Sequence, residues 1–345
     1  MQEIERLVRF SLLFLLLNVL SVQLIFCQNF PDTRVDSLLK SGIRFIINQD
    51  YSSAGSNFEQ LDTEYPELPL GKIYLAALKI AESFDYAEEY DTKYIESSLG
   101  AAQEQINKLL QQDENNLWYI YFSALVQGYT AYFEALKRNW LTSLSKGWNS
   151  ISAFEECLNF DDKFYESYIA IGTFEYWKSK KTEFLAWMPF YENDIEAGIE
   201  ILKTAVKYAS YNHYLAINSL MWIYIDQKEF SKAIELGEEA LTEFPNSRYF
   251  KRGLARAYQD VDPQRSIELY SEILESYPSN RKQNHINFVR LNHKIAQEYA
   301  QLGENEKAIL HCDQILAIDN LSEFELSKLS SRIERVRELR NSLTE

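Results

Sequence analysis

One spacing of apolar and small residues recurs along this chain of 345 residues and constrains its fold. Between Tyr214 and Ser247, two apolar-periodic runs are separated by the polar break 226–229, and the second run ends at Pro245. Separations of three, four and seven residues place side chains on one face of an α-helix. Proline ends the second run because it has no N–H and crowds the preceding turn. The stretch therefore predicts a helix–turn–helix unit of about 34 residues.

The same spacing occurs near both ends of the chain. Near the start it is carried by Gly42, Phe45, Ala54, Phe58, Leu61 and Pro66. Near the end it is carried by Ala296, Tyr299, Ala308, Cys312, Ile315 and Asn320. Three independent occurrences predict a repeat array, in which each unit buries its apolar face against its neighbours.

This pattern resembles the tetratricopeptide repeat. Ile171-Gly172 match the Leu-Gly of that repeat, and YWKS (176–179), DIEAGIEIL (194–202) and ARAY (255–258) also resemble exported bacterial tetratricopeptide proteins of the cell envelope. The expected fold is all-α: a right-handed α-solenoid of about seven helix pairs. Repeat seven is expected at 289–320, after a polar spacer at 280–287. The amphipathic stretch 323–343 is expected as a C-terminal capping helix.

The first 27 residues differ in character from the rest. Basic residues precede an apolar stretch over 10–26, which is typical of a secretory signal peptide. We therefore expect a signal peptide at 1–27, cleavage after Cys27, and a repeat domain at 28–345 in the periplasm or cell envelope. An uncleaved membrane anchor is the main alternative. Lipidation of Cys27 is less favoured because Phe26 is bulky.

Two further cysteines, Cys157 and Cys312, fall in different repeats. Several helix layers of about 8–10 Å each are expected between them. A disulfide needs Cα atoms within about 7 Å, so we expect two buried free thiols.

The sequence holds no familiar catalytic or metal-binding motif. None of the four histidines is paired at i, i+4, and there is no Cys-x-x-Cys, phosphate-binding loop or G-x-S-x-G. We expect a protein that is not an enzyme and uses no cofactor or metal. The formal net charge of −16 repels phosphate backbones and predicts no nucleic-acid partner.

The resemblance implies that the first helix of each repeat lines a concave groove that binds a protein or peptide. Counting from the repeat anchors gives an aromatic middle and a basic end near the C-terminus. The inward positions that we expect to bind a peptide are Tyr129, Tyr132, Tyr176, Trp177, Asn218, Trp222, Arg252, Arg256, Arg290 and Lys294. Phe133, His293 and Gln297 project to the same side.

Some members of the family hold a peptide's C-terminal carboxylate with Lys, Asn and Arg from adjacent repeats. The Asn, Arg and Lys residues among these positions are a similar set, although Trp222 stands where a second Asn is expected. In the alternative interpretation, the cations pair with nearby acids such as Asp226 and Asp260.

A second function class remains open because the connection 182–193 is unusually apolar. It is expected as a helix extension packed against repeat three (helices 117–137 and 144–160) and repeat five (214–247), as a lid, or as a membrane contact. As a lid it would cover an aromatic pocket between those repeats, in a small-ligand-binding protein or an enzyme. Membrane contact is otherwise expected only through an uncleaved N-terminal segment.

Overall fold

A computed structural model describes residues 28–183, 194–278 and 285–344. The signal-peptide prediction and nearly all of the insertion 182–193 lie outside these residues. No strand is found in the described ranges. The α-helices are α2 (Thr33–Ile47), α3 (Tyr51–Glu64), α4 (Leu70–Tyr86), α5 (Thr92–Gln112), α6 (Leu117–Leu136), α7 (Trp140–Phe160), α8 (Tyr168–Thr182), α9 (Ile195–Tyr208), α10 (His213–Asp226), α11 (Phe230–Glu243), α12 (Arg248–Tyr258), α13 (Pro263–Glu275), α14 (His285–Gln301), α15 (Asn305–Leu316) and α16 (Glu323–Ser342), with a 3₁₀ turn at Tyr165–Ser167.

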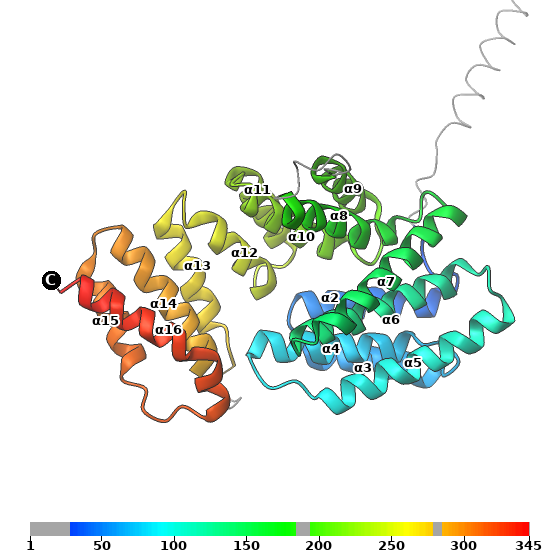
Figure 1. Cartoon of the computed structure of the whole chain (residues 1–345), viewed down its shortest axis with the longest axis horizontal. Coiled ribbons are helices and arrows are strands. Elements are labelled where there is room, and N and C mark those ends of the chain that lie inside the picture. Colours follow the sequence, from blue (N-terminus) through cyan, green and yellow to red (C-terminus); the bar gives the residue numbers. More distant parts are fainter. Residues whose placement is uncertain (1–27, 184–193, 279–284, 345) are drawn as a thin grey trace, which may run out of the picture.

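Consecutive helices pack in pairs from α2 with α3 to α14 with α15, and α16 packs on the last pair (Figure 1). We number these pairs in chain order as repeats one (α2 and α3) to seven (α14 and α15). The prediction of an all-α solenoid of seven helix pairs with a capping helix is confirmed. No helix among the described residues is both long enough and apolar enough to span a bilayer.

Two helices begin earlier than the periodicity indicated. The second helix of repeat three starts at Trp140 instead of Leu144, after Arg138 adopts a left-handed φ of 65° and ends α6. Helix α14 starts at His285, inside the expected polar spacer. There the backbone N–H of His285 donates to the Glu325 carboxylate of α16 at 2.6 Å. This acceptor lies in the capping helix, 40 residues along the chain, and is not visible in the local sequence.

The small and apolar residues of the repeat pattern form the seams between helices. Ala54, Phe58, Ala233 and Ala308 are fully buried. A Cβ at Gly172 of α8 would lie 2.8 Å from the backbone oxygen of Gly198 in α9, which is closer than real contacts allow. Glycine is needed at this crossing because the two helix backbones approach directly.

Cys157 and Cys312 are buried free thiols, as predicted. Burial raises the pKa of the Cys157 thiol to about 12 and that of Cys312 to about 11. Both therefore act as small apolar core residues at neutral pH.

The array coils back on itself, so that its first two repeats lie against its later ones (Figure 1). The Tyr211 hydroxyl donates to Asp36 at 2.6 Å and accepts from the Phe30 backbone at 2.7 Å. Ile47, at the end of α2, shares an apolar cluster with Met221 and other residues of repeats five and six. The concave surface is thus partly covered by the chain's own N-terminal repeats, which the expectation of an open groove did not include.

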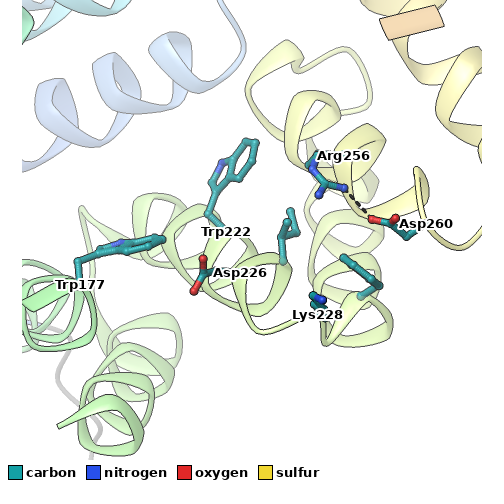
Figure 2. Close-up of a pocket in the computed structure, with 8 residues that line it drawn as sticks. Trp177, Trp222, Asp226, Lys228, Arg256 and Asp260 are labelled. Carbon is teal, nitrogen blue, oxygen red and sulfur yellow. Dashed lines mark hydrogen bonds and ion pairs between the residues drawn. The ribbon is translucent and has the colours of Figure 1, made fainter. Parts of the chain in front are cut away.

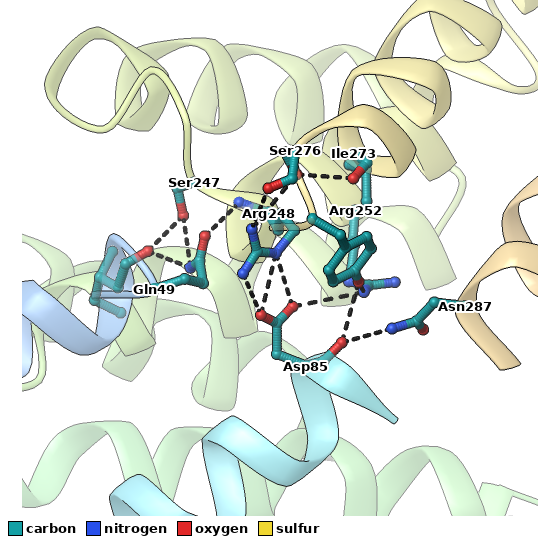
Figure 3. Close-up of polar contacts among 10 residues, drawn as sticks. Gln49, Asp85, Ser247, Arg248, Arg252, Ile273, Ser276 and Asn287 are labelled. Atoms are coloured by element: carbon teal, nitrogen blue, oxygen red, sulfur yellow. Dashed lines mark hydrogen bonds and ion pairs between the residues drawn. The ribbon is translucent and has the colours of Figure 1, made fainter. Parts of the chain in front are cut away.

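We call this contact between the first two repeats and the later ones the closure. A buried polar contact of the closure is centred on Asp85 in α4 (Figure 3). Its carboxylate accepts two hydrogen bonds of 3.1 Å from Nε of Arg248 and one of 2.5 Å from Nη2. Its backbone carbonyl accepts from the Tyr277 hydroxyl at 3.0 Å and from the Asn287 amide at 2.7 Å. One residue of repeat two therefore joins repeats six and seven.

We predict that Asp85→Ala lowers the free energy of unfolding by about 3–5 kcal/mol, because it leaves the Arg248 guanidinium buried without a counter-charge. Urea unfolding followed by circular dichroism measures this change. Glu268→Ala is the matched control. It breaks the exposed pair with Arg265, which is 2.9 Å apart, and should cost less than about 1 kcal/mol. Equal small effects of both variants would show that the closure adds little stability.

Candidate functional site

The aromatic residues predicted for the middle of the groove lie in different environments. Tyr132 is 47% exposed, whereas Tyr129 is half-buried and burial raises its pKa to about 12. Asn218 is half-buried, and its amide oxygen Oδ1 is buried with no hydrogen-bond partner in the described part of the chain. Tyr132 is therefore accessible to a partner, whereas the Asn218 amide oxygen is not.

Tyr176 is not on the inner surface. Its side chain is fully buried in a cluster with Leu202 and Ile223, and its hydroxyl donates to Asp226 at 2.8 Å. Phe133 is also buried, beside Tyr90. Helix periodicity identifies a face but cannot distinguish its accessible middle from an edge that a neighbouring helix covers.

Trp177 and Trp222 line one pocket of about 460 Å³ (Figure 2). Asp226, Arg256 and Asp260 complete its polar side. The Arg256 guanidinium pairs with Asp260 at 2.9 Å, and both side chains remain partly exposed. The pocket lies among the first helices of repeats four, five and six, so it is displaced by about one repeat from the aromatic pocket that the sequence predicted.

Arg252 is part of the closure. It donates to the Tyr277 hydroxyl and lies 3.6 Å from the Asp85 carboxylate. Together with the Arg256–Asp260 pair, this matches the alternative interpretation, in which acids neutralise these arginines. Neither Arg252 nor Arg256 is a free cation.

Arg290 and Lys294 differ from these arginines. Both are half-buried on α14, and neither has a carboxylate within ion-pair distance among the described residues. Burial lowers the pKa of Arg290, and the nearby Arg252 lowers it further. Burial also lowers the pKa of Lys294, with added repulsion from Arg256 and Arg332. The fold therefore gathers cations here that are not individually neutralised.

Arg332 of the capping helix α16 completes this group, and sequence reasoning missed it. It is half-buried, and its pKa is lowered by burial and by Arg335 and Arg290. Its Nη1 lies 3.3 Å from Nδ1 of His293. The helix was interpreted only as an apolar cover for the last repeat, and no local signal shows that one of its arginines faces α14. We call Arg290, Lys294 and Arg332 the inner basic cluster.

Two acids near this cluster, Glu298 and Asp260, attract Lys294 and partly offset the lowering of its pKa, but neither lies within ion-pair distance of it. The Glu298 carboxylate accepts a hydrogen bond of 2.6 Å from the Gln259 amide, and burial raises its pKa. Asp260 is paired with Arg256. No group of three or more His, Cys, Asp or Glu side chains in the described ranges is arranged to hold a metal ion.

His293 lies beneath the cluster and is only 2% exposed. Burial lowers its pKa to about 4, with further lowering by Arg332, Arg335 and Lys294. The imidazole is therefore neutral at pH 7 and adds no charge to the cluster.

No protein-family model matches the sequence, and no curated protein matches it either. Among solved structures, the chain is similar to PilW, a type IV pilus biogenesis factor, at 14% identity and a TM-score of 0.48, over 74% of this chain and 98% of that one. It is also similar to the C-terminal part of a TPR repeat-containing protein from Cytophaga hutchinsonii, at 18% identity and a TM-score of 0.39, over 84% and 99%.

A third neighbour is human IFIT1, solved as a dimer with PPP-AAAA, at 13% identity and a TM-score of 0.48. The match covers 84% of this chain and 62% of IFIT1. The fold is that of a tetratricopeptide-repeat-like protein. With all three TM-scores below 0.5, these similarities give no information about a partner, either protein or nucleic acid.

We predict that His293 makes the protein less stable as the pH falls. Its pKa is about 4 when folded and about 6.5 when unfolded, so the unfolded chain binds more protons between these values. The stability due to the neutral imidazole is fully present above pH 6.5 and is lost as the pH falls toward 4. Wild type should lose about 2 kcal/mol more than His293→Gln between pH 7 and pH 5. Urea unfolding at both pH values measures this difference, and equal losses would contradict the assignment.

Proposed function

We propose that this protein is a non-catalytic binding protein that holds an acidic protein segment on the inner surface of repeats six and seven. The observation that carries the proposal is the inner basic cluster. Three half-buried cations that have no ion-pair partner among the described residues lie together in a chain whose formal net charge is −16. Like charges at close range destabilise the free protein, and carboxylates from a partner would relieve this repulsion.

The geometry suits a carboxylate-bearing segment. Arg290 and Lys294 are four residues apart and so project from the same face of α14, and Arg332 approaches from α16. Each charge-assisted hydrogen bond to a carboxylate contributes about 1.5–3 kcal/mol before the cost of ordering the partner. A C-terminal carboxylate or an Asp or Glu side chain would supply the same chemistry.

The rest of the segment would follow the inner surface toward repeat five. The exposed parts of Trp222 and Tyr132 offer aromatic contact. Arg256 can exchange its exposed contact with Asp260 for a partner carboxylate at small cost, because such surface pairs contribute little. Arg252 is expected to stay with Asp85.

A second candidate function is small-ligand binding in the pocket of Trp177 and Trp222. Its volume of about 460 Å³ lies in the range of small-molecule sites, and two indoles with a few polar groups are a common lining. Native mass spectrometry of the purified protein would detect a retained small molecule. Loss of that molecule in Trp222→Ala, at unchanged affinity for acidic peptides, would support this function.

Export to the periplasm or cell envelope is part of the proposal and is supported by the composition of residues 1–27. N-terminal sequencing of the natural protein should then begin at Gln28. A chain that retains Met1 or carries lipid on Cys27 would contradict it.

We predict that Arg290→Ala with Lys294→Ala weakens binding of a fluorescent Asp- and Glu-rich peptide by about tenfold or more, measured by anisotropy at low salt. The melting temperature should stay at or above that of wild type, because the change removes repulsion between half-buried cations. Comparing free and amidated C-termini of the same peptide shows which carboxylate is held.

Lys232→Ala with Arg265→Ala is the matched control. It removes the same charge from pairs with Glu229 and Glu268. Equal weakening by the two double variants would indicate only a general charge effect. Binding of a single-stranded RNA through the same residues, without binding of peptides, would show that the partner class is wrong.

A further inference from the structure

The first half of α7 contributes no buried side chain to the core. None of the residues 140–149 is buried, whereas Ser150, Ile151, Phe154 and Cys157 in the second half all are. Exposed helical segments in soluble proteins are normally polar on the outer face. This segment is instead rich in large apolar side chains.

Four large apolar side chains are exposed within nine residues of this segment. Their exposed fractions are 66% for Trp140, 85% for Leu141, 61% for Leu144 and 51% for Trp148. Trp140, Leu144 and Trp148 recur every four residues and so form one stripe along the helix. The Trp148 ring meets Phe174 of α8 edge-on, at 5.2 Å between ring centroids, which extends the patch onto the next helix. An exposed apolar patch of this kind usually marks an interaction surface. We call these four α7 residues the α7 patch.

The segment that carries the α7 patch has a net charge of opposite sign to that of the whole chain. Residues 135–154 contain no Asp or Glu, although the chain has 51 of them, and they include Lys137, Arg138 and Lys146. Lys137 pairs with Glu96 and Glu134 at 2.5 and 2.7 Å. Arg138 and Lys146 have no carboxylate within ion-pair distance in the part of the chain that the structure describes. The patch is therefore apolar and locally cationic.

We propose that the α7 patch is a membrane-surface contact that inserts its tryptophans and leucines at the headgroup level of an anionic bilayer. Tryptophan favours this level because its ring is apolar and its N–H can still meet water or headgroups. Arg138 and Lys146 would meet the negative surface charge. The helix would lie in the plane of the interface, as amphipathic surface helices do, and would not span the bilayer.

A second copy of the chain fits the patch less well. In a two-fold dimer the patch would meet itself, so that Arg138 and Lys146 would face the same cations with no acid from residues 135–154 between them. Anionic headgroups offer the complementary charge. The contact also lies on different helices from the inner basic cluster and does not depend on the proposed peptide-binding function.

Vesicle flotation tests this contact. The chain beginning at Gln28, checked for helicity by circular dichroism, is mixed with vesicles of equal parts phosphatidylcholine and phosphatidylglycerol. We expect wild type to float with these vesicles, less at high salt, and hardly with phosphatidylcholine alone. Trp140→Ser with Leu144→Ser should reduce the bound fraction by about tenfold or more, with an unchanged helical spectrum because neither side chain is buried.

Phe84→Ser with Leu310→Ser is the matched control, because both residues are 56% exposed but lie outside the patch. It should float like wild type. Three outcomes would overturn the proposal: no flotation of wild type, equal loss in the two double variants, or a dimer in analytical ultracentrifugation that the Trp140 and Leu144 variant dissociates.

Discussion

The buried ion pair between Asp85 and Arg248 connects parts of the array that are 163 residues apart. Removing both charges from water is costly, and the site offsets this cost with further hydrogen bonds to Ser276, Tyr277 and Asn287 (Figure 3). Because repeats two, six and seven meet at this point, the curvature of the solenoid is held by more than contacts between neighbouring repeats. The shape of the inner surface therefore depends on this closure.

The closure also organises the charge of the inner surface. The Asp85 carboxylate forms a close ion pair with Arg248 and a longer one with Arg252, and Asp260 pairs with Arg256. The cations on α14 and α16 are left without such partners in the described chain. An acidic protein thus carries a small basic region whose nearest acids, Glu298 and Asp260, attract Lys294 without forming an ion pair with it. Low solvation there strengthens the interaction of each cation with a bound carboxylate.

The two halves of α7 differ in how they are related to the core. The second half of α7 is held by buried apolar side chains, so its sequence follows the repeat pattern. No side chain in the first half is buried, and its large tryptophans and leucines are exposed. The inner basic cluster, on α14 and α16, and the α7 patch are therefore separate features on different helices of one array.

The sequence by itself determined the helix pairs, because the spacing of small and apolar residues reports directly which face of each helix is buried. Ala54, Phe58 and Ala233 lie in the predicted seams for this reason. Tertiary structure alone decided the closure through Asp85, the burial of Tyr176, and the pairing of Arg252 and Arg256. It also decided that Arg332 of the capping helix joins Arg290 and Lys294. These features depend on contacts between residues far apart in the chain, and helical periodicity carries information only about neighbours within a few turns.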